Sequence, residues 1–166
     1  MTETSARFAL PLLQSGQAQK EIYHNEALAL IDLAIAPRVE ALAVNDPPMT
    51  PAVGQCWIVG PTPTGDWGGR AETIAGWTSG GWRFVAPAGG MLVWVSPSGM
   101  WARRASGAWL LGDLPVSRLS VGGQQVIGSR QAAISEPAGG SVIDVEARLA
   151  VAAILAALRS HGLIAT

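Results

Sequence analysis

The stretch from residue 55 to residue 111 constrains the fold most, because it holds all seven tryptophans and is repeatedly interrupted by glycine, serine and proline. Short runs rich in Trp, Val and Ile lie between these interruptions. Runs of this length separated by turn-forming residues predict an antiparallel meander. The expected strands are residues 56–59, 73–78, 82–85, 91–95, 100–104 and 108–111.

A helix is predicted on the N-terminal side of this region. Residues 17–36 contain neither proline nor glycine, and Pro37 and residues 45–48 then end the helical pattern and start an extended segment. A break of the helix near residues 24–25 is an open alternative. Apolar residues in the segment approximate one helical face: Ile22, Leu28, Ile31 and Ile35.

A second helix is predicted over residues 145–160. Asp144 is the expected N-cap and Gly162 lies just beyond the end, while Glu146 in the first turn and Arg159 in the last suit the helix dipole. Residues 121–128, ahead of this helix, predict a hairpin or extended pair with a Gly-Gly turn.

Residues 149–158 of the second helix are apolar around the full circumference, so this segment has to be surrounded by other chain. One hypothesis is that copies of the chain gather through this helix in a ring-like or trimeric assembly, as a trimer or a pentamer. The other is an intrachain pair with the N-terminal helix. Of these we favour the cluster. Its expected contact residues are Leu149, Ala152, Leu155, Ala156 and Leu158.

Together these patterns predict an α+β chain with three zones. Residues 1–48 form an N-terminal helical segment and extended arm, and residues 49–114 form the Trp-rich β unit. Residues 115–166 form a β-like connector and the oligomerising helix. A charged fraction of 14% beside an apolar fraction of 49% is low for a small monomer, which also favours subunit contacts.

Composition excludes several classes of partner. With 11 basic and 12 acidic side chains the net charge is -1, so nucleic acid is not an expected partner. The lone Cys56 and the two histidines, His24 and His161, give no metal-ligand spacing, so we expect no metal and no cofactor. Residues 1–14 lack the features of a signal peptide, and the longest apolar run is about half a membrane span, so we expect a soluble protein made and assembled in the cytoplasm.

The sequence offers little for catalysis, and we expect no enzyme. No serine lies in a nucleophile elbow, and the histidines are too few for a nucleophilic triad. Asp66 and Glu72 flank a loop and could form the acid and base of a glycan or cell-wall hydrolase, which is one alternative function. Ordinary turn chemistry is the favoured explanation of both carboxylates.

The tryptophans are the best candidates for a binding role. Trp67 lies in a Gly-rich loop, and Trp101 shares a strand face with Arg103, so these three side chains are candidates for an exposed platform on which sugar rings stack. A carbohydrate-binding module is therefore a second alternative function. Four other tryptophans are assigned to the interior of the β unit: Trp57, Trp82, Trp94 and Trp109.

The N-terminal part of the chain also resembles a known family. Residues 10–21, LPLLQSGQAQKE, followed by NEAL at residues 25–28, resemble the opening signature of the domain of unknown function 2793 family. Further pieces continue the likeness, which covers about residues 8–110: WIVG, GDW, IAGW and GWRF. Residues 126–134 and 144–164 look like a C-terminal module of fibre and spike proteins.

The resemblance implies a virion component, because such proteins are typical of phages, prophages and gene transfer agents of alphaproteobacteria. It implies a head spike or tail fibre protein that contacts capsid, spike or fibre subunits and supports attachment to host surface polysaccharide. The family supplies no catalytic residues. Since the chain has no repeats and no extended shaft, we expect a base or adaptor. Phage or gene transfer agent, head or tail, and the symmetry are left open.

Overall fold

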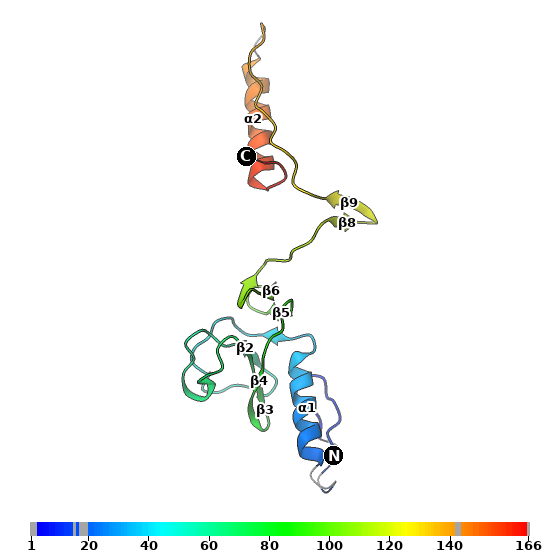
Figure 1. Cartoon of the computed structure of the whole chain (residues 1–166), viewed down its shortest axis with the longest axis vertical. Coiled ribbons are helices and arrows are strands. Elements are labelled where there is room, and N and C mark those ends of the chain that lie inside the picture. The colour runs from blue at the N-terminus through cyan, green and yellow to red at the C-terminus, as the bar shows by residue number, and fades with distance from the viewer. Residues whose placement is uncertain (1–2, 15, 17–19, 142–143, 166) are drawn as a thin grey trace. The chain divides into compact units, whose positions relative to one another are not determined.

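The computed structural model describes residues 3–14, 16, 20–141 and 144–165. The chain has two compact units, Met1–Leu114 (unit 1) and Pro115–Thr166 (unit 2). An N-terminal helix, antiparallel sheets with clustered tryptophans and a C-terminal helix confirm the predicted α+β class (Figure 1).

Helix α1 of unit 1 is residues Lys20–Ala34, and it passes through residues 24–25 without a break. Residues 17–19 of the predicted helix lie outside the described residues. The Arg7 side chain donates to main-chain oxygens at the end of α1 and just beyond it, and so satisfies carbonyls that a helix C-terminus leaves without partners. The acceptors are Asp32, Leu33, Ile35 and Ala36.

The N-terminal arm is bound to α1 through a second set of contacts, centred on Asp32. This carboxylate is buried and accepts from Ser5 Oγ at 2.7 Å, from the Arg7 amide at 2.9 Å and from the Phe8 amide at 2.7 Å. Helix and arm therefore satisfy each other's polar groups, which a buried carboxylate requires. These contacts join residues about 25 positions apart, and no local sequence pattern predicts them.

The first sheet of unit 1 has the antiparallel order β2-β3-β4, formed by Cys56–Ile58, Ile74–Thr78 and Gly81–Val85. A short 3-10 turn, η1 (Gly65–Trp67), lies between β2 and β3. Helix α1 packs against β3 and β4. Leu33 of α1 lies so close to Gly76 of β3 that a Cβ there would overlap the leucine side chain, so only glycine permits this approach.

The second sheet has the order β1-β5-β6-β7. Its strands are Arg38–Val39, Leu92–Val95, Met100–Ala105 and Ala108–Leu111. The six predicted strands are confirmed to within one residue at each end, and consecutive strands pair antiparallel as predicted. The pairing is interrupted once, because the strands divide between two sheets at the Pro- and Gly-containing segment 86–91. Strand β1, which pairs in parallel with β5, was not predicted.

One buried cluster joins both sheets to α1 and forms the main core of unit 1. A second cluster lies around the tryptophans of the first sheet: Trp57, Val59, Trp67 and Ala75. The main cluster consists of Leu33, Val39, Cys56, Ile58, Ile74, Val93, Val95 and Ala102.

Unit 2 contains a hairpin and a helix. Strands β8 (Leu119–Val121) and β9 (Gln124–Ile127) form the predicted hairpin, and its Gly-Gly turn has positive φ at both residues, as a type I′ turn requires. Helix α2 is Val145–Ser160, with the Asp144 side chain accepting from the Ala147 amide at 2.8 Å, so the predicted helix and its N-cap are confirmed. Gln131 pairs in parallel with Ile164, in the segment that follows α2.

Candidate functional site

Two surfaces of the chain carry polar or aromatic side chains beside a pocket. The first is the outer face of the second sheet. Its side chains alternate along the strands with the buried valines and Ala102 that face the core. Strand register places the members of this outer face in neighbouring rows: Arg38, Trp94 and Trp101 in one row, and Leu92, Arg103 and Leu110 in the next.

Trp94 and Trp101 are directly opposed across β5 and β6 and pack edge to face, with ring centroids 5.2 Å apart. Trp101 keeps 39% of its surface exposed. A shallow pocket of about 380 Å³ lies beside it, and this pocket has glycine at two positions of its lining. The full lining is Gly99, Met100, Trp101, Gly112 and Leu114.

Charged groups flank this aromatic pair on two sides. Arg103 Nη2 lies 2.5 Å from Asp113 Oδ2, and the carboxylate is exposed. Arg38 Nε donates to Ser96 Oγ at 2.6 Å, and among the described residues this guanidinium forms no ion pair. The outer face therefore combines an open aromatic ring with donors and an acceptor, which are the groups that bind polar ring-shaped ligands.

The expectation that Trp67 is an exposed platform residue is wrong, because its side chain is 0% exposed. The η1 turn directs the indole ring inward, where its centroid lies 6.4 Å from that of Trp57 and 5.1 Å from that of Trp82. The glycine-rich sequence predicted an exposed loop. In the structure this loop forms a tight turn, and its one large side chain, Trp67, packs in the interior.

Trp94 is more exposed than predicted. The strand pattern predicts an interior side chain, but Trp94 lies half-buried on the outer face. Alternation along β5 shows that neighbours point oppositely but not which set faces the core, and here Val93 and Val95 do. The buried position of Trp57 is confirmed, and Trp82 and Trp109 are half-buried.

The two carboxylates considered for hydrolysis have separate environments. Glu72 Oε2 accepts from Arg104 Nη1 at 2.6 Å, and the Glu72 main-chain oxygen accepts from Trp109 Nε1 at 3.1 Å. Glu72 thus connects the loop before β3 to strands β6 and β7. Asp66 is exposed in the first turn of η1. The Glu72 contacts are those of a residue that joins two sheets.

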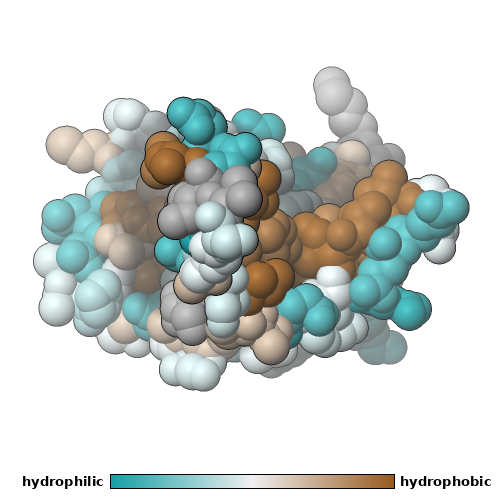
Figure 2. Space-filling view, turned by 90° about the horizontal axis from the view of Figure 1, so that it is seen from above, coloured by the Kyte–Doolittle hydropathy of each residue, from teal (hydrophilic) through white to brown (hydrophobic). Residues whose placement is uncertain are grey.

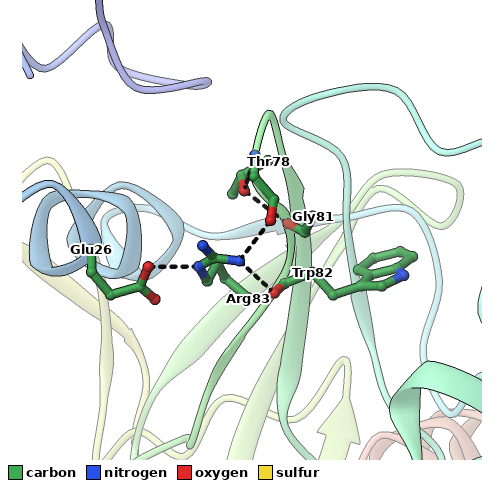
Figure 3. A network of polar contacts seen from close by, with 6 residues as sticks. Glu26, Thr78, Gly81, Trp82 and Arg83 are labelled. Carbon is green, nitrogen blue, oxygen red and sulfur yellow. Dashed lines mark hydrogen bonds and ion pairs between the residues drawn. The ribbon is translucent and has the colours of Figure 1, made fainter. Parts of the chain in front are cut away.

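The second surface lies between the N-terminal arm, α1 and the β3–β4 turn, around a cavity of about 340 Å³. Arg83 crosses its edge, with Nε donating to Glu26 Oε2 at 2.7 Å and Nη1 donating to the main-chain oxygens of Gly80 and Trp82 (Figure 3). Strand β4 is an edge strand, so this guanidinium occupies a carbonyl that another strand would otherwise pair with. We therefore interpret the network as edge protection and as attachment of α1.

The described residues offer neither an activated thiol nor a cluster of metal ligands. Burial raises the pKa of the Cys56 thiol from 9.0 to about 11, so this residue is a poor nucleophile. Within the described residues, His, Cys, Asp and Glu form no group of three or more that could hold a metal ion. No helix in that part of the chain has both the length and the apolar character needed to cross a bilayer.

The predicted oligomerisation residues of α2 fall into two groups. Leu155 is 4% exposed and packs within unit 2, whereas Leu149 is 66% exposed. Ala156 is exposed, and Ala152 and Leu158 are half-buried. Figure 2 shows hydrophobic residues at the molecular surface on the face that it draws, without distinguishing the elements they belong to.

The chain is thus an α+β protein with a Trp-rich first unit and an apolar, exposed second unit. The family of proteins of unknown function DUF2793 matches residues 24–110, more than half of the chain, and the chain belongs to this family. No curated protein matches it.

Proposed function

We propose that the chain is a non-enzymatic structural subunit of a phage or gene transfer agent particle, at the base of a head spike or tail fibre. In this proposal unit 2 joins copies of the chain, and unit 1 is presented to support attachment to host surface polysaccharide. The observation that carries the proposal is the uncovered apolar surface of unit 2.

Unit 2 has almost no core of its own. Among its described residues only two hydrophobic side chains are buried, Leu155 and Ile164. A unit of this size is marginally stable even with a full core, so it needs further burial. Both of its elements expose large apolar side chains that could supply it: Leu119, Val121, Val126 and Ile127 in the hairpin, and Val145, Leu149, Val151 and Ile154 in α2.

Further copies of the chain are the partner that best fits this surface. A helix that is apolar around its circumference needs neighbours on several sides, which a symmetric cluster of identical helices supplies. The alanines along α2 permit close approach of such helices. Other particle proteins would then bind the assembled base.

The setting in a particle rests on the resemblance of residues 8–110, 126–134 and 144–164 to proteins typical of phages and gene transfer agents; the family that matches residues 24–110 is itself one of unknown function. A structural role agrees with the side chains described above, since Glu72 is engaged by Arg104 and Cys56 is buried.

Light scattering of the full chain tests the assembly. We expect an oligomer at micromolar concentration, and we expect the double change Leu149→Glu and Ile154→Glu to reduce the subunit number, because it places carboxylates in an apolar contact. Met49→Glu is the matched control, since Met49 is an exposed apolar residue of unit 1, and it should leave the mass unchanged. A monomeric wild-type chain would overturn the proposal.

Electron microscopy with a labelled antibody tests the setting. Particles purified from cells that encode the chain should carry the label on the head or on the tail. Particles that contain capsid protein but lack this chain would overturn the assignment to a virion, while leaving the assembly result intact.

A further inference from the structure

We propose that the outer face of the second sheet binds an acidic polysaccharide, with one sugar ring stacked on Trp101 and a sugar carboxylate paired with Arg38. The inference deepens the proposed function and rests on it only for the source of the polysaccharide, the host surface. Trp67 is buried and is not part of this proposed site, whose residues all lie on the outer face.

The aromatic part of the face suits the apolar side of a pyranose ring. Trp101 is exposed on one side and is supported on the other by the edge-to-face contact with Trp94. Because both rings project from paired strands, the platform is fixed before a ligand arrives, which reduces the entropy lost on binding. An aromatic ring held in this way presents its face to the C–H groups of a sugar.

The pocket beside Trp101 provides room for the ring. Gly99 and Gly112 in its lining both have positive φ, a conformation that favours glycine, and they carry no side chain that would fill the space. A ligand can therefore approach the main chain closely next to the indole.

The charges on the face favour an acidic sugar over a neutral one. Two guanidiniums, Arg38 and Arg103, are accompanied by one carboxylate, Asp113. Asp113 pairs with Arg103, and within the described residues Arg38 has no carboxylate partner. A planar guanidinium pairs well with the carboxylate of a uronic acid. The exposed Asp113 oxygens can accept hydrogen bonds from sugar hydroxyls.

Binding of the full chain to two soluble polymers tests the inference, with alginate as a uronate polymer and dextran as a neutral one. We expect titration calorimetry to show binding to alginate that weakens as salt is raised, and little binding to dextran. Trp101→Ala should weaken alginate binding about tenfold through loss of stacking. Arg38→Gln should weaken it about fivefold through loss of the charged pair.

A second site variant and a control variant separate loss of the binding site from loss of folding. Arg38 is an exposed side chain, so Arg38→Gln tests the site even where Trp101→Ala impairs folding, which circular dichroism would reveal. Tyr23→Ala is the matched control, because Tyr23 is an exposed aromatic residue of α1 away from the sheet, and it should leave binding unchanged.

Absence of binding to alginate, equal binding to dextran, or an equal loss in Tyr23→Ala and Trp101→Ala would each overturn the inference. These outcomes are separate from those of the proposed function, because the subunit number and the presence of the chain in particles are measured without any glycan.

Discussion

Units 1 and 2 both carry a helix rich in apolar residues, yet they use it differently. Helix α1 packs one side on a sheet, and its Leu33 belongs to a core shared with two sheets. Helix α2 buries Leu155 but leaves large apolar side chains exposed on the rest of its surface. Unit 1 thus has the contacts of an independent domain, whereas the described part of unit 2 buries only Leu155 and Ile164 among its hydrophobic side chains, which is why we propose a partner for it.

Replacement of Leu155 should separate the two units most sharply. We expect Leu155→Glu to cost unit 2 about 3–5 kcal/mol, because a carboxylate would be buried without a partner, and helix α2 and the assembly would be lost together. Circular dichroism and light scattering measure the two losses. Tryptophan fluorescence should not change, since all seven tryptophans lie in unit 1.

The conservative change Leu155→Met is the control for this experiment, because it keeps the volume and apolar character of the side chain and should preserve the assembly. A concurrent change in tryptophan fluorescence in Leu155→Glu would show that the folding of unit 1 depends on unit 2, and the comparison would fail.

Gly76→Val should have the complementary effect, confined to unit 1. The added side chain would overlap Leu33, and overpacking of this kind costs about 2–3 kcal/mol. Urea unfolding followed by tryptophan fluorescence should shift to lower urea, while the subunit number is unchanged. Gly89→Val is the matched control, because a Cβ at Gly89 meets no neighbouring atom. Equal shifts in both variants would contradict the close α1–β3 contact.

Local patterns predicted much of this fold. The N-cap Asp144 and the Gly-Gly turn at residues 122–123 act within a few residues of their own position, so their roles can be recognised from spacing alone. The short strands likewise follow from turn residues on both sides of each run. The same holds for the exposure of Trp101, which shares a strand face with Arg103.

Contacts between distant residues were not predictable in this way. The parallel pairing of β1 with β5 joins residues far apart in the sequence, and the contacts of Ser5 and Arg7 with Asp32 depend on how the arm folds back. The burial of Trp67 has the same origin, because it depends on the nearby rings of Trp57 and Trp82. These residues needed the three-dimensional structure.

Cys56 gives a pH-dependent effect and a further probe of unit 1 alone. Its pKa is raised by burial from 9.0 to about 11, so the folded state favours the neutral thiol more than the unfolded state does. The unfolded chain therefore releases this proton first, and the contribution of Cys56 to stability is complete below pH 9 and lost as pH rises toward 11. We expect the urea concentration at which unit 1 unfolds to fall as pH rises through this window, measured by fluorescence. The variant Cys56→Ala should lack this component, and an unchanged slope in that variant would assign the pH dependence to other groups.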